Sequence, residues 1–159
     1  MRVGRMLIAG VVARIAGTIF GIATCGWLFN WVYTLEPTEI WKPMAGPPPI
    51  WFNAASLGLG IVLALVYALL YRGIPGKGIV KGLVFGLFIW LVGTLPGMLS
   101  TYTFMRVATT VVIYWTILGL VALLVEGAII AAIYGNPEGG NEKVIGMDAY
   151  IKEQGGKNG

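Results

Sequence analysis

The 159-residue chain contains no histidine and only one cysteine, Cys25. Without histidine it lacks the usual axial ligand of haem, the commonest transition-metal ligand and the usual acid–base group near neutral pH. A single thiol cannot close an intramolecular disulfide or hold an iron–sulfur cluster. We therefore expect no metal and no cofactor, although a bound lipid is compatible with the composition.

Charge is also scarce: charged residues make up 11% of the chain, against about 25% in soluble domains, whereas apolar residues make up 57%. About 20 apolar residues in a helix cross a hydrocarbon core of about 30 Å. Four stretches reach or approach that length, namely residues 6–33, 50–71, 79–99 and 107–134. The sequence therefore predicts an all-α transmembrane four-helix bundle over residues 1–134, followed by a polar cytoplasmic tail over residues 135–159.

Lysine and arginine are unevenly distributed between the two sides that four crossings define. The connections on one side contain only Lys42 and Arg106. The other side carries the remaining basic residues apart from Arg14, namely Arg2, Arg5, Arg72, Lys77, Lys81, Lys143, Lys152 and Lys157. An excess of basic residues marks the cytoplasmic side, so we expect a multi-pass protein of the cytoplasmic membrane with both termini cytoplasmic. Because these basic residues sit at helix ends, the net charge of +4 does not indicate nucleic-acid binding.

An internal repeat appears when the chain is shifted by 76 residues, which places Arg5 on Lys81. The shift superimposes identical residues of the first and third stretches: Leu7, Gly10, Gly17, Thr18 and Gly21 on Leu83, Gly86, Gly93, Thr94 and Gly97. The second and fourth stretches align with a shift of 63 residues, which places Tyr71 on Tyr134. The pattern predicts two repeated helical hairpins related by an axis along the membrane normal. Chance coincidence between glycine-rich helices is the alternative.

The glycines of the first and third stretches are candidates for helix packing, because small residues at four-residue spacing let helix backbones approach closely. They are Gly10, Gly17, Gly21, Gly86, Gly93 and Gly97. Lining a pore or docking a partner is the alternative role. Pro96 lies inside the third stretch, and its missing N–H predicts a kink or an end of the helix near Leu95, with an outer turn over residues 99–106.

The connection between the first two stretches, residues 34–49, is rich in proline and bracketed by Trp41 and Trp51 in its second half. Tryptophan prefers the headgroup level of a bilayer. We expect a structured cap that lies along the membrane interface and anchors it. A docking surface for another subunit is the alternative.

Arg14 and Glu126 are the two ionisable residues well inside the apolar stretches. Arg14 lies nine residues after Arg5, or about 13 Å along a helix, and Glu126 lies eight residues before Tyr134, or about 12 Å. The two charges are therefore at similar depth on antiparallel helices, and a charge at mid-membrane costs at least about 2.5–3.5 kcal/mol. We predict an ion pair that sets the helix register. The alternatives are separate positions, with Arg14 reaching the headgroups, and a role in proton or solute passage.

Residues 71–97, YRGIPGKGIVKGLVFGLFIWLVGTLPG, resemble uncharacterised small four-helix integral membrane proteins of bacteria and archaea. The shared features are a Gly-Pro turn, Lys-Gly-Leu, Phe-Gly-Leu, Trp-Leu and Leu-Pro-Gly. The resemblance implies a four-helix membrane fold. It implies no activity and no catalytic residue.

The expected function follows from the absence of catalytic motifs in this largely apolar sequence. No nucleophile–base pair, metal cluster or phosphate-binding loop is present in the sequence, so no enzyme activity is expected. The favoured function is a non-catalytic accessory or structural subunit of a larger membrane protein complex, in contact with membrane lipids and with other integral membrane subunits. The alternative is a small channel or transporter that uses the Arg14–Glu126 pair.

Overall fold

The computed structural model describes residues 3–41 and 48–135 of the chain. The described part contains four helical segments that are long and apolar enough to cross a membrane: Val3–Leu28, Ile50–Leu70, Gly78–Phe104 and Thr109–Tyr134. The first combines α1 (Val3–Gly21) with a π-helical segment (Ile22–Leu28), and the second is α2 (Ile50–Leu70). The third joins α3 (Gly78–Ile89), a π-helical segment (Trp90–Thr94) and α4 (Leu95–Phe104), and the fourth is α5 (Thr109–Tyr134). The expected all-α four-helix bundle is thus confirmed.

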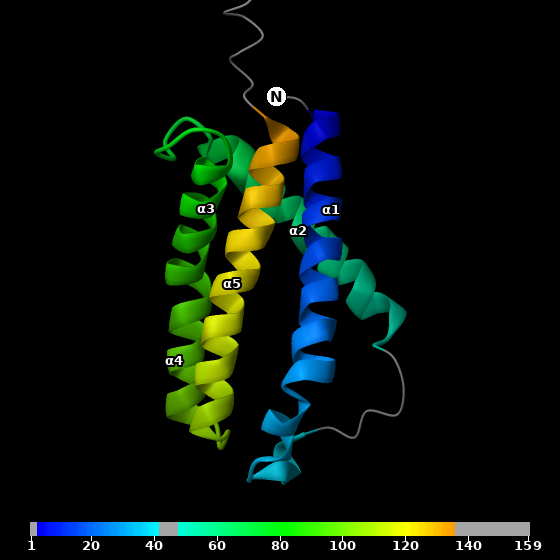
Figure 1. Cartoon of the computed structure of the whole chain (residues 1–159), viewed down its shortest axis with the longest axis vertical. Coiled ribbons are helices and arrows are strands. Elements are labelled where there is room, and N and C mark those ends of the chain that lie inside the picture. The colour runs from blue at the N-terminus through cyan, green and yellow to red at the C-terminus, as the bar shows by residue number, and fades with distance from the viewer. Residues whose placement is uncertain (1–2, 42–47, 136–159) are drawn as a thin grey trace, which may run out of the picture.

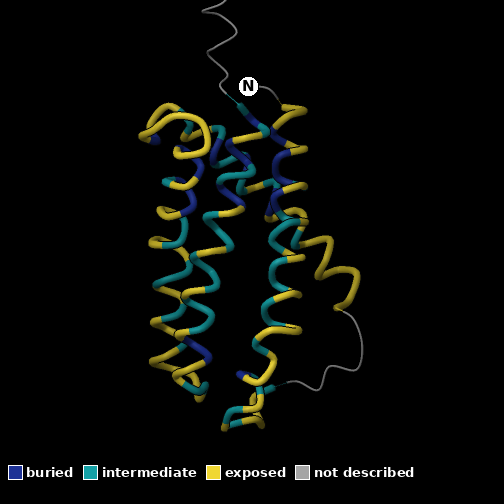
Figure 2. Tube along the Cα trace, viewed as in Figure 1, coloured by how far each residue is buried: buried dark blue, intermediate teal, exposed yellow. Residues whose placement is uncertain are grey.

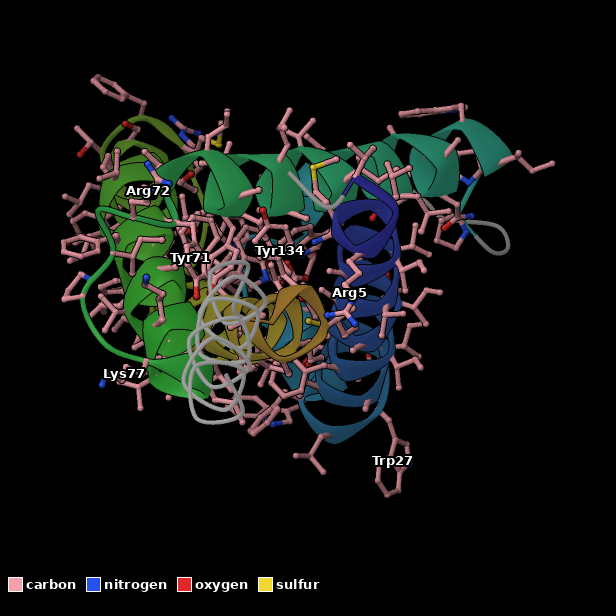
Figure 3. The ribbon with its side chains drawn as sticks, turned by 90° about the horizontal axis from the view of Figure 1, so that it is seen from above. Arg5, Trp27, Tyr71, Arg72, Lys77 and Tyr134 are labelled. Carbon is pink, nitrogen blue, oxygen red and sulfur yellow. The ribbon has the colours of Figure 1, made fainter. Side chains whose placement is uncertain are left out.

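Helix α5 lies between α1 on one side and the α3–α4 helix on the other (Figure 1). Helix α2 contacts α1 and makes little contact with α5. It crosses α1 obliquely, and its first turns extend past α1 in both the side view and the end view (Figures 1 and 3). The start of α1 and the end of α5 lie at the same end of the molecule, which we call the terminal end; the opposite end is the outer end (Figure 1).

The hydrophobic core is concentrated toward the terminal end of the bundle (Figure 2). Its buried residues come from all four spanning segments and from the turn between α2 and α3: Met6, Ala9, Ala13, Ala64, Tyr67, Ile74, Phe85, Ile130, Ala131 and Tyr134. Toward the outer end most residues are exposed or half-buried (Figure 2). The helices are therefore held together chiefly at one end, and their outer halves present apolar side chains to the surroundings.

Three close backbone contacts join the helices in this core, and glycine is required at each. A Cβ on Gly10 of α1 would lie 2.6 Å from the carbonyl oxygen of Gly60 on α2. A Cβ on Gly82 or Gly86 of α3 would collide with the backbone of Gly127 or Leu123 on α5. Small residues at helix crossings permit this close packing.

Of the glycines expected to pack, Gly10 and Gly86 lie at backbone contacts between helices, whereas Gly21, Gly93 and Gly97 do not. A Cβ on any of these three would meet no atom of the described chain within 4 Å. Gly21 lies beyond the α1–α2 contact, and Gly93 and Gly97 are exposed on the third span, so equal spacing in the sequence did not place these three glycines at a contact. Gly17 has a different role, described below.

The close contacts of the two hairpins fall at equivalent positions of the repeat. Gly10 of α1 packs on Gly60 of α2, and shifts of 76 and 63 residues convert this pair into Gly86 and Leu123, which also pack together. In the other contact of the second hairpin, Gly82 packs on Gly127. The equivalent residues of the first hairpin are Met6 and Ala64, and both are buried in the core. The two hairpins therefore make a close backbone contact at equivalent positions, although α2 diverges from α1 and α5 stays beside the third span (Figure 1).

Pro96 distorts the third span without ending it. The turn before it, Trp90–Thr94, is π-helical, because proline cannot donate to the carbonyl one turn back and its ring crowds that carbonyl. The helix then continues through Phe104. The expected outer turn over residues 99–106 was therefore placed too early: the connection is only residues 105–108.

The two tryptophans expected to bracket an interfacial cap lie in different surroundings. Trp41 follows a short 3-10 helix (Thr38–Ile40) and packs edge-on against Trp115 of α5 at a centroid distance of 5.8 Å. Trp51, in the first turn of α2, is exposed and contacts its neighbour Phe52. Trp41 thus belongs to an aromatic cluster that joins the first connection to α5, and its place in an interfacial cap stays a prediction. Residues 42–47 of the connection lie outside the described residues.

Candidate functional site

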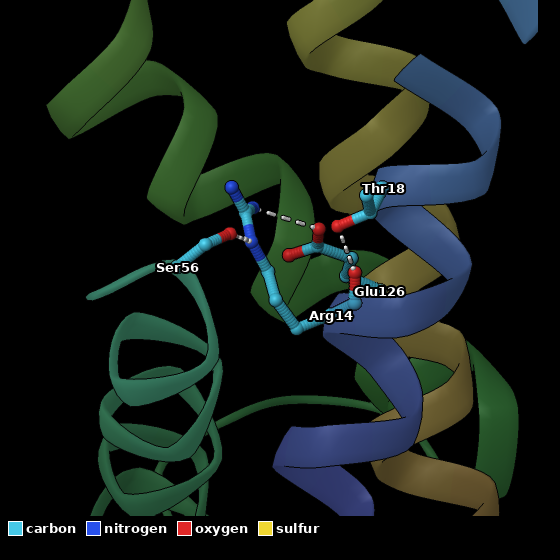
Figure 4. Close-up of polar contacts among 4 residues, drawn as sticks. All are labelled: Arg14, Thr18, Ser56 and Glu126. Atoms are coloured by element: carbon cyan, nitrogen blue, oxygen red, sulfur yellow. Dashed lines mark hydrogen bonds and ion pairs between the residues drawn. The ribbon is translucent and has the colours of Figure 1, made fainter. Parts of the chain in front are cut away.

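Arg14 lies one turn beyond Gly10 on α1, where α1 and α2 begin to separate. The absence of a side chain at Gly60 makes room for it, since a Cβ at Gly60 would lie 2.6 Å from the Cβ of Arg14. The guanidinium is thereby directed into the angle between α1, α2 and α5 (Figure 4).

The guanidinium connects three helices (Figure 4). Its Nε donates a hydrogen bond to Ser56 Oγ on α2 at 2.6 Å, and its Nη1 donates to Glu126 Oε1 on α5 at 3.2 Å. The second contact is also an ion pair. The predicted pairing of Arg14 with Glu126 is therefore present in the structure.

The two charges differ in their surroundings. The side chain of Glu126 is 4% exposed, whereas that of Arg14 is 34% exposed. Gly17 on α1 makes room for the Glu126 carboxylate, because a Cβ at Gly17 would collide with Oε1. The Thr18 hydroxyl donates to the backbone carbonyl of Arg14 at 2.9 Å, so it satisfies itself within α1. Within the described residues the third nitrogen of Arg14, Nη2, makes no hydrogen bond.

A cavity of about 270 Å³ opens beside the pair, between α2 and α5. We call it the α2–α5 cavity. It is lined by Arg14, Leu59, Gly60, Val62, Leu63, Val66, Leu123 and Glu126. The cavity is open because α2 diverges from α5. If α2 lay closer to α5, it would cover the Arg14–Glu126 pair and the apolar side chains around it.

Sequence reasoning missed two members of this site, Ser56 and Gly60. Their four-residue spacing on α2 could have indicated the site, because it places the Ser56 hydroxyl and the space beside Gly60 on the same face of the helix. The repeat offers a second signal. Arg14 is equivalent to Trp90, whose Nε1 also donates to the second arm of its own hairpin, at Thr116 O, 2.9 Å away. The equivalent position thus joins the two arms in both hairpins.

A second cluster lies near the outer end and joins the first connection to α5. Trp115 Nε1 donates to the hydroxyl of Tyr33 at 2.9 Å, and Tyr33 packs edge-on against Trp41 at a centroid distance of 5.3 Å. Burial raises the pKa of Tyr33 to about 12, and a neighbouring thiol, that of Cys25, adds to the rise. Trp41 Nε1 is buried without a hydrogen-bond partner among the described residues. The cluster anchors the connection to the bundle.

In the described ranges, no three His, Cys, Asp or Glu side chains lie close enough together to hold a metal ion. Comparison with protein-family models, curated proteins and solved structures gave no match to this chain. The four apolar spans define a multi-pass integral membrane protein, and any further assignment depends on the site itself.

Proposed function

We propose that this protein is a non-catalytic accessory subunit of a larger membrane complex, with a neighbouring transmembrane helix packed against the diverging half of α2. The observation that carries the proposal is the Arg14 guanidinium, which belongs to the middle of the span Val3–Leu28 and is only partly covered by its own chain. Membrane lipids and other integral membrane subunits are the partners this implies.

The first half of α2 has almost no support from the rest of the molecule. Of residues 50–59 every one is exposed except Ser56, which is half-buried. The large side chains among them are apolar: Ile50, Trp51, Phe52, Leu57 and Leu59. In water such a surface would aggregate, whereas in a bilayer lipid or another protein covers it.

The polar groups beside this surface favour a protein over lipid. Charged side chains within membrane spans face a bundle interior or pair with other polar groups, because hydrocarbon offers no hydrogen-bond acceptor. Arg14 lines the α2–α5 cavity, and its Nη2 has no acceptor in the described chain. A partner helix with a neutral acceptor would complete its bonding, since Glu126 already balances its charge.

Purification from the native membrane in mild detergent, followed by mass spectrometry of co-migrating chains, tests the proposal. A photocrosslinking residue at Leu59, which lines the α2–α5 cavity, should give one protein adduct of defined mass. The same residue at Val92, which is exposed on the third span, is the matched control and should give lipid adducts only.

Arg14→Met should weaken the Leu59 adduct, because the partner loses its polar anchor. A lone monomer in mild detergent, with identical adducts at Leu59 and Val92, would overturn the subunit assignment. Because Val92 is a 78% exposed apolar position on another span, it reports contacts away from the α2–α5 cavity.

A small channel or transporter is the second candidate, favoured by the position of the Arg14–Glu126 pair in the wall of an open cavity. Proton or ion flux into liposomes containing the purified protein measures this directly. Glu126→Gln should abolish the flux if the carboxylate carries it. Flux equal to that of empty liposomes would exclude this candidate for the ions tested.

The orientation follows from the charge distribution. The terminal end carries Arg5, Arg72, Lys77 and Lys81, and we place it, with both termini, at the cytoplasmic face of the cytoplasmic membrane. The tail, residues 135–159, would then be cytoplasmic; beyond Gly135 it lies outside the described residues. Cysteine accessibility to an impermeant reagent, tested on single cysteines placed at Lys77 and at Arg106, distinguishes the two orientations.

A further inference from the structure

Asn53 lies on the outer half of α2, within a surface that is otherwise largely apolar. In residues 50–59 the side chains that can accept a hydrogen bond are those of Asn53 and Ser56. Ser56 already accepts from Arg14. Asn53 is exposed, and its Nδ2 donates to the carbonyl oxygen of Pro48 at 3.3 Å. Its Oδ1 accepts no hydrogen bond from the described part of the chain, so a neutral acceptor is left on this surface.

This acceptor is on the face of α2 that meets Arg14. Asn53, Ser56 and Gly60 are spaced by three and four residues, which places them on one side of a helix. Ser56 bonds to Arg14, and Gly60 makes room for it. Asn53 is about 4.5 Å along the axis from Ser56, in the first turns of α2, which extend past α1 (Figures 1 and 3). Within one chain Asn53 and Arg14 therefore form no hydrogen bond.

Arg14 and Asn53 complement each other chemically. Among the described residues, Arg14 Nη2 is a donor without an acceptor, and Asn53 Oδ1 is an acceptor without a donor. Since Glu126 balances the charge of Arg14, a further carboxylate would add an uncompensated negative charge, whereas an amide would not. Residues 50–59 contain no charged side chain. A second copy of this surface supplies the group that each of the two residues lacks.

Two-fold symmetry satisfies both groups at once. Copies that insert in the same direction are related by an axis along the membrane normal, and such an axis keeps every residue at its own depth. The Asn53 of one copy then lies within about 4.5 Å of the depth of the Arg14–Ser56 contact of the other. In a two-fold interface each contact occurs twice, so a dimer would contain two such hydrogen bonds.

The apolar part of the same surface suits an interface between proteins. Trp51 and Phe52 are 70% and 50% exposed, and aromatic side chains of this kind are enriched in protein–protein interfaces. Leu59, farther along the surface, is 64% exposed. Packing two outer halves of α2 against each other would cover these side chains together with the polar pair.

We infer that the protein forms a homodimer through the outer half of α2, in which Asn53 of each copy accepts a hydrogen bond from Arg14 Nη2 of the other. The inference rests on the function proposed above, because it names a second copy as the source of the neighbouring helix. Each copy contributes a residue to the Arg14 site of the other, and α2 gains the support that its own bundle does not give it.

Photocrosslinking at Leu59 in the native membrane identifies the partner. The full-length chain should give an adduct of twice its own mass, in which every peptide comes from this sequence. An adduct with a different protein would overturn the homodimer and leave the subunit function standing. Lipid adducts alone would overturn both.

Energy transfer between differently labelled copies of the full-length protein in detergent micelles measures the affinity of the dimer. Asn53→Ala should weaken dimerisation at least about fivefold, because each dimer loses two interhelical hydrogen bonds. Arg14→Met should weaken it similarly, and the double variant should lose no more than either single variant. Asn30→Ala is the matched control, because it removes an exposed amide just beyond the first span and should leave dimerisation unchanged.

Mixing the two single variants separates the direct contact from misfolding. Dimers of Arg14→Met copies, and dimers of Asn53→Ala copies, lack both hydrogen bonds. A mixed dimer keeps one, because Asn53 of the first copy meets Arg14 of the second, so it should be at least about twofold tighter than either, beyond random pairing. Mixed dimers no tighter than the others, or equal losses in Asn53→Ala and Asn30→Ala, would overturn the inference.

Discussion

Removing one partner of the Arg14–Glu126 pair should destabilise the protein more than removing both. With an N–O distance of 3.2 Å and an effective dielectric constant of 20, the attraction is about 5 kcal/mol. Desolvation of both ions offsets much of this attraction, but a single substitution leaves the other charge uncompensated, at a cost of about 3–5 kcal/mol.

We therefore expect Arg14→Met and Glu126→Met each to lower the free energy of unfolding by about 3 kcal/mol, the smaller end of the range, because Arg14 is partly exposed. The double variant should lie within about 1 kcal/mol of the wild type, since a methionine pair leaves no buried charge. Methionine suits the test because its flexible side chain fills irregular space.

The assay is reversible unfolding in mixed micelles of increasing sodium dodecyl sulfate content, followed by circular dichroism. Arg106→Met, at an exposed position in the connection to α5, serves as the control and should change the unfolding free energy by less than about 0.5 kcal/mol. The reasoning would be refuted if both single variants stayed within about 1 kcal/mol of the wild type and their effects simply added.

Two further outcomes follow from individual contacts. Gly10→Ala should lower the free energy of unfolding by about 1–3 kcal/mol, because its Cβ would lie 2.6 Å from the Gly60 carbonyl oxygen. Gly21→Ala should be nearly neutral, because its Cβ would meet no atom within 4 Å. Equal effects of the two substitutions in the micelle assay would contradict the α1–α2 crossing seen in the structure. For Tyr33 the folded-state pKa of about 12 exceeds the ordinary value of 10.0, so its contribution to stability is complete below pH 10 and is lost as pH rises toward 12. The tyrosinate absorbance of the wild type minus that of Tyr33→Phe should then titrate near pH 12, and a midpoint near 10 would show that the Tyr33 hydroxyl is not buried in solution.

The sequence by itself determined the number of spans, their approximate bounds and the pairing of the two intramembrane charges. Hydrocarbon thickness sets the length of an apolar helix, and helical rise converts sequence distance into depth, so both follow from counting residues. The match between Arg14 and Glu126 needed only the condition that the two helices run antiparallel.

Tertiary structure alone decided which glycines pack and what lies beside the charges. Gly10 and Gly21 look alike in the repeat, yet only Gly10 lies at a crossing, because the crossing point depends on the angle between two helices and not on either helix alone. The same angle separates the first half of α2 from the bundle, opens the α2–α5 cavity and leaves Arg14 partly uncovered. The sequence determines which residues lie on each face of a helix. The angle at which a neighbouring helix crosses that face depends on all the contacts in the bundle at once, so only the tertiary structure shows it.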